Sequence, residues 1–344
     1  MAVLHLASSH QRQNRALILP CSHWTLCGEM MNGTQAEVVR PEDPNELARE
    51  VAGLSAKQIL HSNGDCLVAI ARSSQIPTVL REIGRLREIT FRAVGEGTGR
   101  ELDLDAFDEW YMHLFVWDWK KQEVLGAYRV GMTDVLLRQH GVAGLYTSTL
   151  FDYAPGFFEQ LGCALEMGRS FVRAESQRTR VLAHLWRGIG GLISSRPRYT
   201  KLFGPVSISS SYSAESRQFL AAQLSSGDYR HDLSDAVKPL RPLSIPVGAF
   251  SSLGMDIKQL SKHVASLEPS GAGMPILVRE YLKLGGRFLA FSVDHDFGNA
   301  LDGLVAVDLL ETDARLLKLY MGEAAYVAFT RQRQAQPEEV QLAL

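Results

Sequence analysis

Charged side chains lie within apolar sequence at several points of the chain, where they could form buried ion pairs or bind a charged substrate. Asp105 and Asp108 belong to a run of five acidic residues over 101–109, directly before an apolar segment. Such a run alone is typical of a solvated loop. Arg129, however, lies within the apolar segment VLGAYRV, and an unpaired guanidinium is costly to bury. We therefore expect Arg129 to have an acidic partner.

Glu166 and Arg169 are two further charges within an apolar segment, ALEMGRSFV. In a β-strand, an offset of three residues places two side chains on opposite faces of the sheet. We therefore expect no ion pair between them, and each side chain needs a partner from another element.

A basic segment follows. Between Arg169 and Lys201 there are eight basic residues and one acidic residue, a local charge of +7, although the whole chain has 36 basic and 38 acidic residues and a formal charge of -2. A surface with this asymmetry attracts acidic macromolecules. It would equally suit contact with anionic lipid headgroups.

Helices and strands alternate along the chain and must position these residues. Helical periodicity covers 46–60 and 77–95, and in the second helix Arg81, Arg85 and Arg92 lie near one another. This alternation predicts a mixed α/β sheet covered by helices. Further helices are expected over 181–195, from about 213 and over 314–322, and strands over 66–70, 112–119, 124–132, 164–172, 202–209, 287–293 and 302–310.

Composition excludes several classes of protein. With 344 residues, 46% hydrophobic and 22% charged, the chain is typical of a folded globular protein and not of a disordered chain or a general nucleic-acid binder. Its four cysteines form neither a disulfide framework nor a zinc motif, which favours a reducing compartment. Asp294, His295 and Asp296 are more typical of a polar loop than of a metal site. No apolar run is long enough to span a membrane, and charges interrupt the first thirty residues, so we expect a cytoplasmic protein.

Five motifs follow one another along the chain: Arg85–Phe91, Asp105–Asp108, Gly126–Arg129, Glu166–Arg169 and the block LWRGIGGLISSRPRYTKLFGPVSIS. In this order they resemble the acyl-carrier-protein-dependent N-acyltransferases of the GNAT superfamily. Two branches share this pattern, the acyl-homoserine-lactone synthases and the bacterial enzymes that acylate the α-amine of ornithine, glycine or other amino acids in aminolipid synthesis. The resemblance covers residues 75–215, and the segment 281–310 is closer to the aminolipid branch.

The resemblance implies one GNAT-like α/β domain over residues 41–330, preceded by an N-terminal extension (1–40) and followed by a C-terminal tail (331–344). Its sheet would be mixed, mostly antiparallel and flanked by helices, and it would splay to admit a pantetheine arm. The implied reaction moves a long fatty or 3-hydroxyacyl group from acyl carrier protein to the α-amine of an amino acid, in aminolipid or N-acyl amino acid synthesis.

The implied donor is a phosphopantetheine thioester on acyl carrier protein, with acyl-CoA as the alternative. The segment ESQRTRVLAHL lacks the glycines of a coenzyme A binding turn, which favours the carrier protein. No bound cofactor is implied and nothing points to nucleic acid. Because the product would be a membrane lipid, peripheral contact with the inner face of the membrane is compatible with the basic segment.

The resemblance also implies roles for individual residues. Glu166 is the expected general base for the acceptor ammonium, because an apolar strand would raise its pKa toward neutrality. The alternative is that Glu166 is the buried partner of Arg129 or Arg169. Tyr212 is the expected proton donor to the thiolate, and an ordinary packing role is its alternative. The expected substrate-binding residues are Arg85, Asp105, Asp108, Arg129, Arg169, Ser207 and Ser209, and the expected carrier-protein or phosphopantetheine contacts are Arg173, Arg178 and Arg180.

Two other functions stay open on the sequence. An acyl-homoserine-lactone-type signal synthase would use S-adenosylmethionine as the acceptor and release a lactone. A non-catalytic module that binds acyl carrier protein or a membrane would not depend on Glu166 for activity of its pathway. Among amino acids, the acceptor could be glycine, ornithine, lysine or tyrosine.

Overall fold

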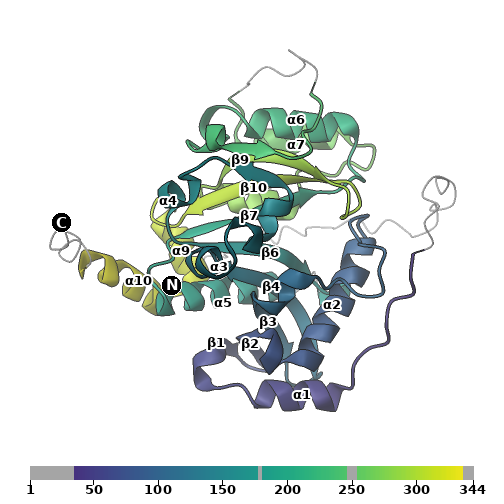
Figure 1. Ribbon diagram of the computed structural model, residues 1–344, viewed down its shortest axis with the longest axis vertical. Helices are drawn as coiled ribbons and strands as arrows, with labels where there is room; N and C mark the ends of the chain where they lie inside the picture. The colour runs from purple at the N-terminus through teal and green to yellow at the C-terminus, as the bar shows by residue number, and fades with distance from the viewer. Residues whose placement is uncertain (1–34, 177–179, 246–253, 336–344) are drawn as a thin grey trace, which may run out of the picture. The chain divides into compact units, whose positions relative to one another are not determined.

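An eight-stranded sheet forms the centre of the computed structural model, which describes residues 35–176, 180–245 and 254–335 (Figure 1). The strand order is β1-β2-β3-β4-β6-β7-β10-β9, and a separate small sheet pairs β5 with β8. The strands are β1 (Ile59–Asn63), β2 (Cys66–Arg72), β3 (Met112–Asp118), β4 (Glu123–Met132), β5 (Phe151–Tyr153), β6 (Ala164–Val172), β7 (Lys201–Ile208), β8 (Val237–Pro239), β9 (Arg287–Asp294) and β10 (Ala300–Asp308).

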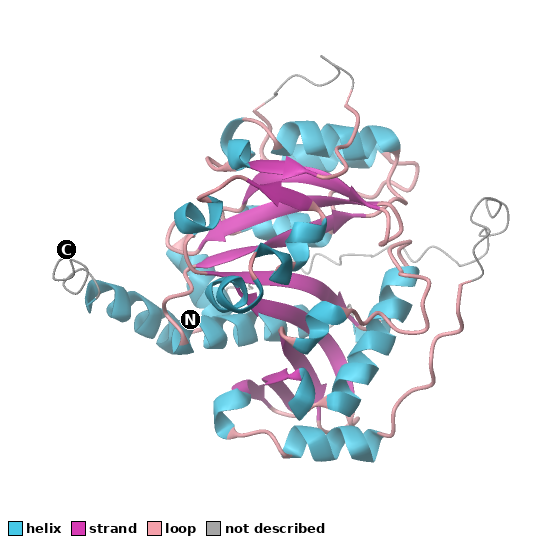
Figure 2. Ribbon diagram, viewed as in Figure 1, coloured by secondary structure: helices cyan, strands magenta, loops and turns pink. Residues whose placement is uncertain are grey.

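Helices cover both faces of the large sheet, as Figure 2 shows by colour. Apolar residues of α5 to α10 pack on one face, and those of α1 and α2 pack on the other face over β2 to β4. A third apolar cluster, which includes α3 and α4, covers that second face near β7, β9 and β10. The α-helices are α1 (Pro44–Ala52), α2 (Pro77–Arg92), α3 (Thr133–His140), α4 (Phe157–Leu161), α5 (Val181–Ser195), α6 (Ala214–Leu224), α7 (Ile257–Leu267), α8 (Ile276–Lys283), α9 (Ala314–Met321) and α10 (Glu323–Ala335).

This two-sided cover explains why the central strands are apolar at nearly every position. In β3, Leu114 and Val116 belong to the cluster under α5, whereas Phe115 and Trp117 belong to the cluster under α2. Successive side chains of a strand point to opposite faces, so a sheet buried on both sides needs apolar residues at both sets of positions.

The sheet splays between β6 and β7. All its other neighbouring strands are antiparallel, but β6 and β7 are parallel, and they pair only from Ala164 with Lys201 to Glu166 with Phe203. Beyond these three pairs the two strands diverge. The mixed, mostly antiparallel and splayed sheet flanked by helices that the family resemblance implied is thus confirmed.

The ends of the predicted domain do not coincide with ends of the described elements. The described residues from Ala36 onward form one compact unit, in which α1 begins at Pro44 and α10 ends at Ala335. The boundaries at residues 41 and 330 stay a prediction. Within the described segments, every helix is too short or too polar to cross a lipid bilayer.

Candidate active site

A buried network of ion pairs lies beside β4 and β6. Arg129 on β4 donates to Asp105 at 2.5 Å and lies 3.4 Å from Asp108, which also accepts from Arg87 on α2 at 2.8 Å. Arg129 is 1% exposed, so these carboxylates supply the acidic partner that its apolar surroundings required. The neighbouring arginines hold the pKa of Asp108 well below its usual range, despite the opposing effect of burial.

Local structure fixes the two aspartates of this network. Asp105 is the N-cap of a short 3-10 helix, Ala106–Glu109, and its carboxylate accepts from the backbone N–H of Phe107 at 2.9 Å. The carboxylate of Asp108 in turn accepts from the backbone N–H of Asp105 at 2.9 Å. Asp105 and Asp108 of the acidic run therefore belong to a capped turn and point into the protein, whereas Glu101 and Glu109 are exposed as a solvated loop would have them.

A β-bulge in β6 changes the direction of Arg169. Between Ala127 and Arg129 of β4, the partners on β6 run from Phe171 to Gly168, so β6 has one extra residue there. Arg169 has a φ of 48° and lies in this bulge. A bulge alters the alternation of side chains, so an offset of three no longer places them on opposite faces.

As a result, Glu166 and Arg169 both contact the segment Tyr146–Thr147, although no ion pair joins them. Arg169 donates to the hydroxyl of Tyr146 at 3.0 Å and lies 3.2 Å from the carboxylate of Asp103. Burial by itself lowers the pKa of Arg169, but Asp103 and the other neighbours raise it well above the usual value, so it stays charged.

Glu166 is fully enclosed on β6 and accepts two hydrogen bonds. One comes from the Tyr111 hydroxyl, and the other from the backbone N–H of Thr147 at 2.8 Å. The same Tyr111 hydroxyl accepts from the backbone N–H of Tyr146 at 2.9 Å. Burial raises the pKa of Glu166, as the sequence led us to expect, but this side chain is not part of the pocket described next.

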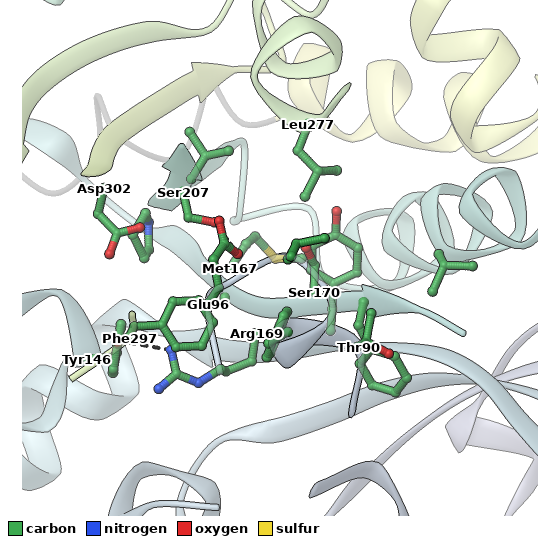
Figure 3. A pocket seen from close by; sticks show the side chains of 18 of the residues that line it. Thr90, Glu96, Tyr146, Met167, Arg169, Ser170, Ser207, Leu277, Phe297 and Asp302 are labelled. Atoms are coloured by element: carbon green, nitrogen blue, oxygen red, sulfur yellow. Dashed lines mark hydrogen bonds between the residues drawn. The ribbon is translucent and has the colours of Figure 1, made fainter. Parts of the chain in front are cut away.

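A pocket of about 220 Å³ opens where β6 and β7 diverge (Figure 3). Residues 167–172 of β6 and 205–207 of β7 form its two long walls. One part of the lining is apolar or aromatic and includes Tyr128, Leu277 and Tyr281. The other part carries polar groups, namely Glu96, Tyr146, Arg169, Ser207 and Asp302.

Glu96 and Asp302 are the two carboxyl groups of this polar part, and both are at least nine-tenths buried. Ser207 donates to Glu96 at 3.0 Å. Burial raises the pKa of Glu96 to about 7, against the opposing effects of Ser207 and Arg169. Burial and the nearby carboxyls of Asp294 and Glu96 raise the pKa of Asp302 well above its usual value.

The loop after α2 holds Glu96 at the pocket. The backbone N–H of Glu96 donates to the carbonyl of Phe91 at 2.8 Å, and Ser209 donates to the carbonyl of Val94 at 2.5 Å. Gly298, in the β9–β10 connection, has a φ of 62°, and a Cβ there would lie 2.0 Å from the carbonyl oxygen of Gly95. Three parts of the chain therefore fix the position of this carboxyl.

Several residues expected from the sequence lie elsewhere. Arg85 is buried on α2 and forms a two-fold hydrogen-bonded pair with Glu82, at 2.6 and 2.7 Å. The Tyr212 hydroxyl donates to the carbonyl of Gly273 at 2.8 Å and does not line the pocket. Ser207 does line the pocket. Ser209 does not line it, but its hydrogen bond to the carbonyl of Val94 holds the loop that carries Glu96.

The three arginines expected to contact the donor differ from one another. Arg173 is held by Glu123 at 2.7 Å and by Glu175 at 3.4 Å. Arg180 is exposed at the start of α5 and has no salt bridge with any residue in the described ranges. Arg178 lies outside the described residues.

Sequence reasoning missed Glu96, Asp302, Tyr128 and Tyr281. Asp302 lies in the apolar segment ALDGLVAVD, so the argument that singled out Arg129 could have found it. Glu96 has no comparable signal, because it lies among glycines in a loop. The hydroxyl of Tyr128 lies near Ser170 and Tyr281, and burial raises the pKa of both tyrosines, so both stay protonated.

Residues 86–187 match the acetyltransferase (GNAT) domain family. The chain is 31% identical over 304 residues to a glycine N(alpha)-acyltransferase of Bacteroides thetaiotaomicron, an alignment that covers 81% of this chain and 88% of that protein. It is 25% identical over 246 residues to an L-ornithine N(alpha)-acyltransferase of Agrobacterium fabrum, covering 70% of this chain and 78% of that protein. The solved structure of FeeM, an N-acyl amino acid synthase from uncultured soil microbes, aligns with 72% of this chain and 93% of its own, at 8% identity and a TM-score of 0.35.

Proposed function

The chain belongs to the amino acid N-acyltransferase family of the GNAT superfamily, and we propose that it transfers a long fatty or 3-hydroxyacyl group from acyl carrier protein to the α-amine of an amino acid. Glycine is the acceptor to examine first, because the relative with 31% identity is named for it. The product would be an N-acyl amino acid, either an end product or the first intermediate of an aminolipid.

The observation that carries this proposal is the pocket between β6 and β7, with carboxyl groups in one part and apolar side chains in another. Where two strands diverge, their facing backbone groups need other hydrogen-bond partners. The amides of a pantetheine arm can supply such partners by lying along a strand edge. An acyl thioester in this position would bring its carbonyl carbon toward Glu96, Ser207 and Asp302, where an amine could attack it.

The surface around α5 supports a carrier-protein donor. Arg180 is exposed directly before α5, and the first turn of a helix favours negative charge such as a phosphate. Acyl carrier protein is acidic, so an exposed arginine beside the pantetheine phosphate would favour it over free acyl-CoA. Arg173 can take part only by exchanging its contacts with Glu123 and Glu175.

The direct test is an assay with the purified chain, palmitoyl-acyl carrier protein and a panel of acceptors. We expect mass spectrometry to detect an N-palmitoyl amino acid, with one thiol released for each amide formed. The panel holds glycine, L-ornithine, L-lysine, L-tyrosine and S-adenosylmethionine. A lactone formed from S-adenosylmethionine, or no acyl product from either palmitoyl-acyl carrier protein or palmitoyl-CoA, would contradict the proposal.

A further inference from the structure

The carboxyl group of Asp302 is enclosed at the pocket without a partner. Asp302 is 4% exposed and lines the pocket beside Glu96 (Figure 3). From the residues that the structure describes, neither a hydrogen bond nor a salt bridge reaches this carboxyl. Buried polar groups are nearly always hydrogen-bonded, so a group that enters the pocket could supply the partner that this carboxyl lacks.

The charges around Asp302 indicate which kind of ligand group could pair with its carboxyl. Glu96 and Asp294 both lie close enough to raise the pKa of Asp302. The nearby cation, Arg169, already contacts Asp103 at 3.2 Å, Asp105 at 3.7 Å and the Tyr146 hydroxyl at 3.0 Å. No salt bridge within the described ranges joins Arg169 to Glu96 or Asp302, and the raised pKa of Asp302 favours its neutral form in the empty pocket. A cation with hydrogen-bond donors would favour the ionised carboxylate and pair with it.

We propose that Glu96 and Asp302 form the acceptor subsite, in which Asp302 binds the α-ammonium of the amino acid and Glu96 takes the proton that its nitrogen must lose. This inference rests on the proposed function and extends it, because it names the base and the group that holds the acceptor. The two carboxyls come from different elements, the loop after α2 and strand β10, and both line the pocket at the divergence of β6 and β7.

The reaction balances with these groups. The α-ammonium transfers one proton to the Glu96 carboxylate, and the free amine attacks the carbonyl carbon of the thioester. A C–N bond forms, the C–S bond breaks, and the second proton of the nitrogen leaves with the sulfur as a thiol. Glu96 then releases its proton to solvent, so one ammonium and one thioester give one amide, one thiol and one proton.

Ser207 and Arg169 would position Glu96 in this scheme. The Ser207 hydroxyl donates to Glu96 at 3.0 Å and leaves the other carboxylate oxygen free of any hydrogen bond from a described residue. The charged and titratable groups around Glu96 are Arg169 on β6, Asp302 on β10 and Tyr212 after β7. Burial outweighs the Ser207 hydrogen bond and the charge of Arg169 and brings the pKa of Glu96 to about 7, the range in which a carboxylate is an effective base.

Two variants test the two roles, with glycine and palmitoyl-acyl carrier protein as substrates. We expect Glu96→Gln to lower kcat by roughly 100-fold or more, with the donor KM changed by less than about threefold. We expect Asp302→Asn to raise the glycine KM by about 10-fold or more, because a charge-assisted contact with the ammonium is lost. The matched control is Glu215→Gln on the exposed face of α6, which should leave both constants unchanged.

The pH profile separates a base from a structural residue. In the wild type, kcat/KM for glycine should rise with pH through the pKa of Glu96, about 7, because only the ionised carboxyl accepts a proton. In Glu96→Gln that rise should disappear, and the rate should recover only toward about pH 9–10, where the amine loses its own proton. A variant that keeps the rise near pH 7, or that loses donor and acceptor binding together with its melting temperature, overturns the assignment.

The same assay distinguishes failure of this inference from failure of the proposed function. If wild-type protein acylates no amino acid, the proposed function itself fails. If the wild type is active and Glu96→Gln retains its rate, the family activity stands and the acceptor subsite is wrong.

Discussion

Glu166 is buried on β6 and lies outside the lining of the pocket. Both of its oxygens accept hydrogen bonds, from Tyr111 and from the backbone of Thr147. Through these bonds it fixes Tyr146, which lines the pocket and accepts from Arg169. We propose that Glu166 is a positioning residue and that the base is Glu96.

Conservative and truncating variants of Glu166 distinguish the two roles. Glu166→Gln keeps one acceptor oxygen for this segment, so we expect kcat to fall by less than about 10-fold. Glu166→Ala leaves two buried donors unpaired, so we expect a loss of about 3 kcal/mol in unfolding free energy, measured by urea denaturation, and a larger fall in kcat. If Glu166 were the base, Gln and Ala would abolish turnover equally while Glu96→Gln would not.

At the scale of elements, the divergence of β6 and β7 makes the pocket, and two glycines near it have opposite surroundings. A Cβ at Gly204 on β7 would lie 2.1 Å from the carbonyl oxygen of Met167 on β6. A Cβ at Gly168 on β6 would meet no described atom within 4 Å, and this residue lines the pocket. Gly204 therefore permits the close approach of the strands, and Gly168 keeps the pocket open.

Substitutions at these two glycines should separate stability from donor binding. We expect Gly204→Ala to destabilise the protein by about 2 kcal/mol, because the contact is with backbone and cannot be relieved by a rotamer change. We expect Gly168→Val to leave the urea midpoint nearly unchanged but to raise the KM of the acyl donor by about 10-fold or more, since its methyl groups would occupy pocket space. Equal loss of stability in both variants would contradict the different roles that we assign to Gly204 and Gly168.

At the scale of the whole molecule, the local charge of the basic segment is smaller than its sequence suggests. Arg169 is paired with Asp103, Arg173 with Glu123 and Arg198 with Asp134, and all three acids come from outside that segment. Partners brought by other elements therefore neutralise part of the +7 that the sequence carries. Arg180 stays exposed and without a salt bridge to any described residue.

Charge reversal at Arg180 tests the carrier-protein donor. We expect Arg180→Glu to raise the KM for palmitoyl-acyl carrier protein by about 10-fold, with the KM for palmitoyl-CoA raised clearly less, because only the carrier protein presents an acidic surface. Raising the salt concentration should weaken the wild-type reaction with the carrier protein in the same direction. Equal effects on both donors would point to the shared phosphopantetheine phosphate instead of the carrier protein.

Local patterns in the sequence predicted a mixed α/β sheet covered by helices, the main strands along the chain and the need of Arg129 for an acidic partner. The mostly antiparallel, splayed form of the sheet was implied by the family resemblance. Apolar periodicity and the cost of burying charge are local properties, so they can be read from one segment at a time. Apolar periodicity also predicted a first helix that continues to residue 60, and this end is wrong. Helix α1 ends at Ala52, before Gly53, and Ile59 begins strand β1. Residues 59–63 form a strand because they pair with β2. The spacing of apolar residues along one segment does not reveal such a partner.

Which charged groups meet depends on contacts between elements that are far apart in the sequence. The bulge at Arg169 reverses the expected alternation in β6, and a bulge depends on how two strands pair and not on either strand alone. Glu96 and Asp302 lie more than two hundred residues apart in the sequence, yet both line one pocket. A loop carboxyl has no periodic signal, and the pKa of Glu96 depends on its burial and on Ser207 and Arg169, which no pattern local to its own segment contains.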